Sequence, residues 1–268
     1  MSEYTVFGAG GFIGSRLSAT LEAKGHAVRR VRRDTWPTRG EALGHVIFTI
    51  GMTADFRTKP FETVESQVGL LARALHDYTF ESFLALSSTR VYRGAESTAE
   101  TARLCVSPAE PDDLYNATKI AGEALCLALP NPEIRVVRLS NIYGWPGPSQ
   151  SFLASVLEEA ARTGSVAFRT GPRSSKDYLD IESVIAALTR IAESGRERIY
   201  NVAAGVNVSN AELAAALERA GVTTCFEPGA PEPVFPVMDV SRLVSEFGIV
   251  SPSLIERLPT LLKAAKER

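Results

Sequence analysis

The chain has 268 residues, of which 45% are hydrophobic and 22% charged, and its formal net charge is −2. These values predict an ordinary globular protein, either one compact unit or a cofactor domain with a smaller appendage. The near-neutral charge gives no reason to expect nucleic acid or an anionic membrane as a partner, and no apolar run approaches the length of a membrane span. Three widely spaced cysteines and three scattered histidines suggest neither a disulfide framework nor a metal site. Without a secretion signal at the N-terminus, we expect a cytoplasmic protein.

A glycine-rich turn stands near the start of the chain. Residues Tyr4 to Phe7 are mostly β-branched or aromatic and predict a short buried strand. Gly8, Gly11 and Gly14 follow at three-residue spacing and lead into an apolar pattern of helical period. A strand that passes through such glycines into a helix is typical of the phosphate-binding turn of a Rossmann unit. The alternative is a glycine-rich turn that binds no nucleotide.

The second predicted strand, His26 to Arg33, ends on two arginines. In a Rossmann unit an acidic residue near this strand end binds the 2′-hydroxyl of the adenosine ribose. Arg32 and Arg33 stand there instead, and a guanidinium group pairs well with a 2′-phosphate. We therefore expect NADP as the cofactor, with NAD as the alternative. In that alternative the arginines are solvated and Asp34 binds the hydroxyl.

Strand and helix patterns then alternate along the chain. The predicted strands are His45–Ile50, Ser82–Leu86, Ile134–Leu139 and Ile199–Ala203, and the predicted helices are Phe61–Tyr78, Asp113–Leu129, Ser151–Arg162, Glu182–Glu193 and Asn210–Ala220. Asp112 or Asp113 is expected to cap the second of these helices. The alternation predicts an α/β fold with a doubly wound parallel sheet. We expect residues 1–144 to form a dinucleotide-binding Rossmann domain, and residues 145–268 a smaller, mainly substrate-binding region, of which 176–203 return to the Rossmann core.

A serine, a tyrosine and a lysine form the main catalytic candidate. Ser88 follows a predicted strand, at the sheet edge where open α/β sheets place their chemistry. Tyr115 and Lys119 lie four residues apart on one predicted helix, so both side chains face the same way. The lysine cation is expected to lower the pKa of the tyrosine and make it a proton donor or acceptor for a carbonyl and alcohol pair. Ser88 would hold the same oxygen.

Five stretches carry a family resemblance. They are Gly8-Ala9-Gly10-Gly11-Phe12-Ile13-Gly14, Ser87-Ser88-Thr89-Arg90-Val91-Tyr92, Tyr115-Asn116-Ala117-Thr118-Lys119, Arg138-Leu139-Ser140-Asn141-Ile142-Tyr143-Gly144 and Lys176-Asp177-Tyr178. Together they resemble the extended short-chain dehydrogenase/reductase family, in its NAD-dependent epimerase/dehydratase branch, which acts mainly on nucleotide sugars. The resemblance covers nearly the whole chain.

The resemblance implies a role for each matching residue. It implies that the cofactor is bound by Gly8, Gly11, Phe12, Ile13, Gly14, Tyr115 and Lys119, to which the strand end adds Arg32 and Arg33. It implies catalysis by Ser88, Tyr115 and Lys119. It implies substrate binding by Ser88, Thr89, Asn141 and Lys176, the last two at the diphosphate of the substrate. It also implies a homodimer that pairs the Phe61–Tyr78 and Asp113–Leu129 helices.

Two departures from the family pattern bear on the expected reaction and on the expected cofactor site. Family dehydratases carry an acidic pair directly after the catalytic serine or threonine, whereas this chain has Thr89 and Arg90, which cannot do that acid–base work. Dehydration is therefore not expected. In addition, only eleven residues separate Arg33 from His45, where relatives fit a helix and a strand. The adenine pocket must be reduced, or one strand lost.

The expected function is NADP-dependent reduction of a keto group on a nucleotide-linked sugar, with Tyr115 as the proton donor. The alternative within the same family is an NAD-dependent 4-epimerase of a nucleotide sugar. A third hypothesis, from another class, is a cofactor-sensing protein that has kept the fold and lost catalysis, and the short stretch before His45 motivates it.

Overall fold

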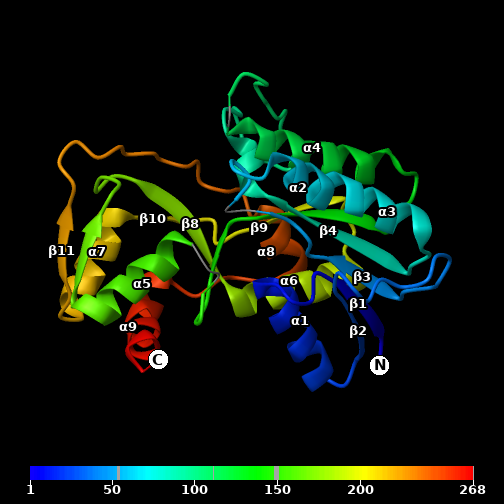
Figure 1. Ribbon diagram of the computed structural model, residues 1–268, viewed down its shortest axis with the longest axis horizontal. Helices are drawn as coiled ribbons and strands as arrows, with labels where there is room; N and C mark the ends of the chain where they lie inside the picture. The colour runs from blue at the N-terminus through cyan, green and yellow to red at the C-terminus, as the bar shows by residue number, and fades with distance from the viewer. Residues whose placement is uncertain (53–54, 111, 148–150, 268) are drawn as a thin grey trace.

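A six-stranded parallel sheet forms the centre of the computed structural model, which describes residues 1–52, 55–110, 112–147 and 151–267 (Figure 1). Its strands lie in the order β2-β1-β3-β4-β5-β9. Their bounds are β1 Glu3–Phe7, β2 Ala27–Val31, β3 His45–Phe48, β4 Ser82–Ser88, β5 Ile134–Leu139 and β9 Ile199–Val202. Because helices cover both faces, the inner strands read as apolar runs, and all six residues of β5 are buried. The predicted doubly wound parallel sheet is confirmed.

Helices cover the two faces of this sheet in separate layers (Figure 1). One face packs against α1 (Phe12–Ala23) and α6 (Ile181–Ser194), which contribute Leu17 and Leu188 to the larger core. The other face packs against α4 (Asp113–Ala128) and a helical segment made of α2 (Pro60–Val64), a π-helical turn (Glu65–Gly69) and α3 (Leu70–Asp77). The chain thus places α4 directly over β4 and β5.

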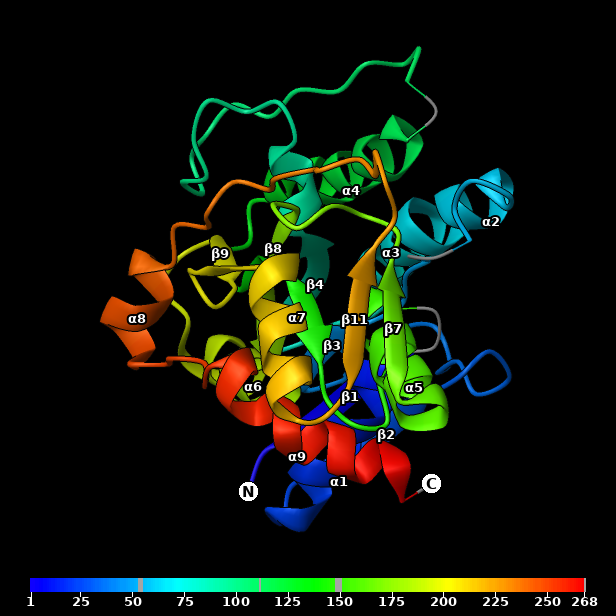
Figure 2. The same cartoon turned by 90° about the vertical axis from the view of Figure 1, so that its left-hand side faces the viewer.

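A second, smaller body of structure follows β5. It contains a three-stranded sheet in the order β10-β8-β6, a two-stranded sheet of β11 and β7, and helices α5, α7 and α9. Figure 2 shows α7 beside β11, with α9 packed below them. The bounds are β6 Asn141–Tyr143, α5 Phe152–Thr163, β7 Ser165–Phe168, β8 Ser175–Asp180, β10 Asn207–Ser209, α7 Asn210–Arg219, β11 Thr223–Phe226 and α9 Leu254–Lys266. Helix α8 (Ser241–Phe247) instead packs on β9 and α6 and contributes Leu243 to the larger core. The division of the chain after residue 144 stays a prediction.

Because the stretch before His45 is short, the sheet lacks the outermost strand of a usual Rossmann unit. Among the strands of the described residues, β2 pairs only with β1 and forms the edge of the sheet. A Rossmann sheet usually has one more strand outside this position. Here residues 32–44 form turns and one isolated bridge, Ala42 to Thr79, instead of a helix and a strand. The β2 side of the sheet is therefore an open edge.

Several local details differ from the expectations. The predicted Phe61–Tyr78 helix contains a π-helical turn, and Asp112 occupies the N-cap position of α4 without making a side-chain cap bond. Its carboxylate instead accepts two hydrogen bonds from Arg57, at 2.6 and 2.8 Å. Ser209 does cap α7, in a full capping box with Glu212. Among the helices of the described residues, none is long and apolar enough to cross a membrane.

Candidate active site

The glycine turn joins β1 to α1 at the carboxyl edge of the sheet. Gly8 has φ 82°, a left-handed conformation that favours glycine, and its N–H donates to Val31 O at 3.1 Å. Helix α1 starts at Phe12 with no side-chain cap bond and no acidic residue in its first turn. Its first N–H groups, including those of Phe12 and Ile13, are therefore unpaired within the helix and suit a phosphate group. The turn fits the pyrophosphate of a dinucleotide.

Gly14 packs the start of α1 against β1 and β3, and a side chain there has no space. A Cβ at Gly14 would lie 2.8 Å from Thr49 Oγ1 and would also overlap the Gly8 carbonyl. We expect Gly14→Ala to lower the free energy of unfolding by about 1–3 kcal/mol, because the backbone must shift. Gly10→Ala is the matched control, since no atom of the described residues lies within 4 Å of a Cβ at Gly10. Urea denaturation without cofactor measures both, and equal stabilities of the two variants would contradict this close packing.

Arg32 and Arg33 leave the end of β2 next to this turn. The carbonyl of Val31, the last residue of β2, accepts from the N–H groups of both Gly8 and Ala9. Both arginines are exposed, and within the described part of the chain neither forms an ion pair. Arg30, by contrast, is held by Glu22 through two hydrogen bonds, at 2.8 and 2.6 Å. Two unpaired cations thus lie at the open edge of the sheet.

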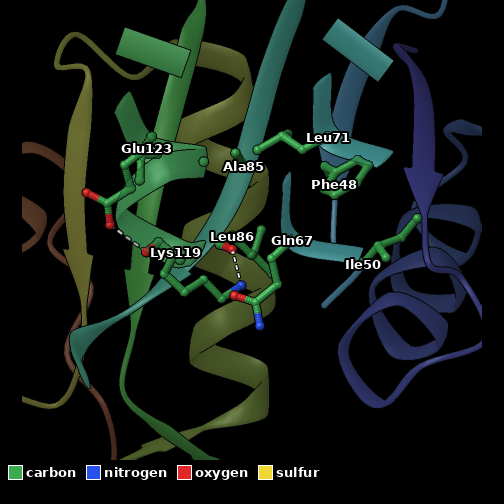
Figure 3. Close-up of a pocket in the computed structure, with 11 residues that line it drawn as sticks. Phe48, Ile50, Gln67, Leu71, Ala85, Leu86, Lys119 and Glu123 are labelled. Atoms are coloured by element: carbon green, nitrogen blue, oxygen red, sulfur yellow. Dashed lines mark hydrogen bonds between the residues drawn. The ribbon is translucent and has the colours of Figure 1, made fainter. Parts of the chain in front are cut away.

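The serine, tyrosine and lysine come from two neighbouring elements. Ser88 is the last residue of β4, and its Oγ accepts a hydrogen bond from Arg90 N at 3.2 Å. Tyr115 and Lys119 lie in the first two turns of α4, and Lys119 Nζ is 5.9 Å from the centroid of the Tyr115 ring. Lys119 Nζ also donates to Leu86 O of β4 at 2.9 Å (Figure 3). The predicted juxtaposition of tyrosine and lysine is present.

The pKa of Tyr115 differs from the expectation. Burial raises it, and the Ser88 hydroxyl and the Arg90 guanidinium only partly offset this effect. Lys119 was expected to lower it, but burial dominates because the whole Tyr115 side chain is withdrawn from water, with only 5% of its surface exposed. Burial also lowers the pKa of Lys119, to about 8, against the opposing effect of Glu123. At neutral pH the phenol therefore holds its proton.

The predicted substrate residues lie on β4, β6 and β8. Thr89 begins the 3-10 turn that follows β4. The side-chain amide of Asn141, in β6, donates to Asp177 O of β8 at 2.8 Å, so this part of the amide is already engaged. Lys176, also in β8, places Nζ 4.7 Å from the centroid of the Phe152 ring. Since β1, β4 and β5 are parallel, Gly8, Ser88 and Asn141 lie at or just after the carboxyl ends of these strands, at one edge of the sheet.

A family model describes most of this site. The model of the NAD dependent epimerase/dehydratase family matches residues 49–203, which is more than half of the chain. The chain belongs to this family. The match includes Ser88, Tyr115, Lys119, Asn141 and Lys176 and begins after the glycine turn.

This member of the epimerase/dehydratase family has distant relatives of known structure or activity. It is 27% identical to dTDP-glucose 4,6-dehydratase of Streptomyces griseus over 145 residues, which are 52% of this chain but only 43% of that enzyme. The match thus spans less than half the length of this curated relative. Its structure is similar to that of MoeE5 in complex with UDP-glucose and NAD, with a TM-score of 0.79 and 23% identity over 99% of both chains. It is equally similar to RMD from Pseudomonas aeruginosa complexed with NADPH, at 24% identity over 100% of both chains.

A buried charge network lies behind the active-site candidates of this epimerase/dehydratase family member. Glu123 of α4, whose side chain is labelled in Figure 3, forms a two-pronged ion pair with Arg138 of β5, with Nη2 to Oε2 at 2.6 Å. Ser87 Oγ donates to Glu123 Oε1. Arg138 also donates to the Tyr92 hydroxyl at 2.7 Å, which in turn donates to Asn201 Oδ1. Sequence reasoning did not find this network. One signal was available, since Glu123 follows Lys119 by four residues and so shares its helix face.

Proposed function

We propose that the protein is an NADPH-dependent reductase that acts on a keto group of a nucleotide-linked sugar. The observation that carries the proposal is the protonated, buried Tyr115 beside Ser88 and Lys119, at the sheet edge that also carries the glycine turn. Two similar structures support the ligand classes, since MoeE5 was solved with UDP-glucose and NAD, and RMD with NADPH. A nicotinamide cofactor and a nucleotide sugar are thus the ligands we assign to this chain.

Each candidate residue has a distinct role in this proposal. The nicotinamide cofactor, when bound, supplies the hydride. The phenol of Tyr115 donates its proton to the carbonyl oxygen, and a raised pKa suits a donor that must arrive protonated. Ser88 orients the same oxygen through its hydroxyl, and Lys119 supports the phenolate that remains. Gly8, Gly11 and Gly14 allow the pyrophosphate to approach the backbone at the start of α1.

Three predicted substrate residues complete the assignment. Lys176 and Asn141 would bind the diphosphate of the nucleotide sugar, and Thr89 would contact the sugar. The Lys176 ammonium has no ion pair among the residues that the structure describes, so it is free to meet an anion. Thr89 and Arg90 stand where dehydratases need acidic residues, which argues for reduction over dehydration.

The cofactor preference follows from the end of β2. We expect isothermal titration calorimetry to give tighter binding of NADPH than of NADH, because two unpaired guanidinium groups can pair with the 2′-phosphate. The double variant Arg32→Ala/Arg33→Ala should lose about 10- to 100-fold in affinity for NADPH and little for NADH. Arg30→Ala is the control, because Arg30 lies on the same strand but is already paired with Glu22.

Two other results would redirect the proposal. NAD retained through purification, without net turnover, would favour the 4-epimerase, which regenerates its cofactor in each cycle. Failure to bind either dinucleotide would mean that loss of the outer strand has removed the cofactor site.

A homodimer is also part of the proposal. We assign the interface to the layer of α2, the π-helical turn, α3 and α4, which lies on one side of the sheet (Figure 1). Phe61 and Val64 of α2 are 86% and 44% exposed, and Leu127 of α4 is also exposed. These apolar side chains are the ones that a second copy would cover.

A further inference from the structure

Arg90 is held over the proposed reaction centre. It follows Ser88 by two residues, in the 3-10 turn Thr89–Tyr92. Its Cζ atom lies 5.3 Å from the centroid of the Tyr115 ring and 5.1 Å from that of the Phe56 ring. Its side chain is 28% exposed. The rings of Phe56 and Tyr115 thus hold the Arg90 guanidinium beside the phenol that would transfer the proton. Part of the guanidinium surface remains open to a ligand.

Arg90 has little of the pairing that a half-buried guanidinium needs. Among the described residues its one ion pair is with Asp112, where Nη2 lies 3.5 Å from Oδ2, and its side chain donates no hydrogen bond. Asp112 is already engaged by Arg57 through two short hydrogen bonds. A guanidinium has five N–H donors, so most of those of Arg90 lack a protein acceptor. A partly desolvated cation in this state favours an anionic ligand.

The charges around Arg90 leave an excess of positive charge. The groups that face it are Arg57, Arg93, Lys176, Asp112 and the phenol of Tyr115, and Arg93 lies 3.8 Å from the carboxylate of Asp113. Counting Arg90 itself, four cations thus stand against the two carboxylates of Asp112 and Asp113. Burial lowers the pKa of Lys176, and the charge of Arg90 lowers it further, so these two cations act on each other. An anionic ligand would relieve this repulsion.

We propose that Arg90 binds a carboxylate on the sugar, and that the substrate is therefore a nucleotide-linked uronic acid. This inference rests on the proposed function, because Tyr115 then marks the position of the reacting sugar carbon. A guanidinium and a carboxylate form a forked pair of charge-assisted hydrogen bonds, a geometry that a neutral hydroxymethyl group does not match. Arg90 would hold the acidic end of the sugar while Lys176 holds the diphosphate.

The anion that meets Arg90 has two possible sources, the sugar carboxylate and the diphosphate. Both offer oxygens that a guanidinium binds equally well. The position beside Tyr115 favours the carboxylate, since the group next to the phenol must be the sugar. Comparing ligands with and without the carboxylate separates the two sources.

The test is calorimetry on the protein loaded with NADP, using matched pairs of ligands. The pairs are UDP-glucuronic acid with UDP-glucose, and dTDP-glucuronic acid with dTDP-glucose, with UDP and dTDP as sugar-free ligands. With one of the two nucleotides, we expect the glucuronic acid derivative (the glucuronide) to bind about 10- to 100-fold more tightly than the glucose derivative (the glucoside). Arg90→Gln should remove this preference. Its affinities for the glucoside and the free nucleotide should stay within about threefold of those of the wild-type protein.

Two further variants sharpen the result. Arg90→Lys keeps the charge without the fork and should retain part of the preference. Lys176→Gln should weaken binding of the uronic-acid, glucose and sugar-free forms of a nucleotide alike. Thermal unfolding and NADPH binding of each variant show whether it folds normally.

Three outcomes would overturn the inference. They are a wild-type protein with no preference for the glucuronide, an equal loss of all ligands in Arg90→Gln, and a loss of turnover in Arg90→Gln with binding of every ligand unchanged. The second would assign Arg90 to the diphosphate, and the third would make it a group that acts only on Tyr115. Failure of every nucleotide and nucleotide sugar to bind would instead overturn the proposed function itself.

Discussion

Tyr115→Phe is expected to lower turnover by about 10²- to 10⁴-fold while leaving cofactor binding within a small factor of wild type. The change removes only the phenol oxygen, which is the group that would donate the proton. The ring remains packed against Phe56, whose centroid lies 5.3 Å away, so the fold should be kept. Steady-state consumption of NADPH with a 4-keto nucleotide sugar measures turnover, and calorimetry measures binding.

Tyr178→Phe is the matched control for this prediction. Tyr178 of β8 is as buried as Tyr115, with 5% of its surface exposed, but it lies in the core of the smaller body. In the part of the chain that the structure describes, its hydroxyl makes no side-chain hydrogen bond, so its removal should change turnover little. An unchanged rate in Tyr115→Phe would exclude it as the proton donor. The same result would favour the hypothesis of a cofactor-sensing protein, because such a protein should keep its cofactor binding in this variant.

The sheet could be predicted from the sequence because its signals are local. The run Val46–Phe48 is apolar over its full length, and Ile134–Leu139 is apolar except for Arg135 and Arg138, as is typical of buried parallel strands. The strands that were missed, β6, β7, β10 and β11, have only three or four residues each and belong to the smaller sheets. Most of them are only partly buried, and β10 reads Asn207-Val208-Ser209. Their pairing depends on distant partners, so no periodic pattern marks them.

The π-helical turn within Phe61–Tyr78 had no signal in the apolar pattern either. Glu65–Gly69 accommodates a wider turn, and Gln67 in its middle donates to Met52 O at 2.8 Å. Thr118 of α4 donates to Gln67 Oε1 at 3.0 Å, so this glutamine joins the segment after β3 to the helix that carries Tyr115 and Lys119. Such a link becomes visible only when three separate segments have been assembled.

The candidate site divides in the same way between local and non-local causes. The spacing of Tyr115 and Lys119 on α4 could be predicted, because a helix brings residues four apart to one face. The direction of the Tyr115 pKa shift could not, since it depends on how much of the assembled protein covers the phenol. The pairing of Glu123 with Arg138 likewise joins a helix to a strand, and both side chains are almost fully buried.

Removing the negative charge of the Glu123–Arg138 pair should have the largest effect on stability. We expect Glu123→Gln to lower the free energy of unfolding by about 3–5 kcal/mol, because it leaves the Arg138 guanidinium buried without a countercharge. Glu22→Gln is the matched control. The Glu22–Arg30 pair has the same two-pronged geometry, but its side chains are 43% and 34% exposed, and ion pairs in contact with water contribute little. Urea denaturation of the two variants isolates the effect of burial.

The same variant should also change how the protein responds to pH. Burial lowers the pKa of Lys119 to about 8, and the carboxylate of Glu123 opposes this effect. Replacing that carboxylate by a neutral amide should therefore lower the pKa of Lys119 further. If a charged Lys119 supports the Tyr115 phenolate, the alkaline limb of kcat/KM should move to lower pH in Glu123→Gln and stay in place in Glu22→Gln. Equal losses of stability in the two variants would show that burial of the Glu123–Arg138 pair is not what stabilises the fold. A pH profile that does not move would separate the buried network from proton transfer and leave it a purely structural role.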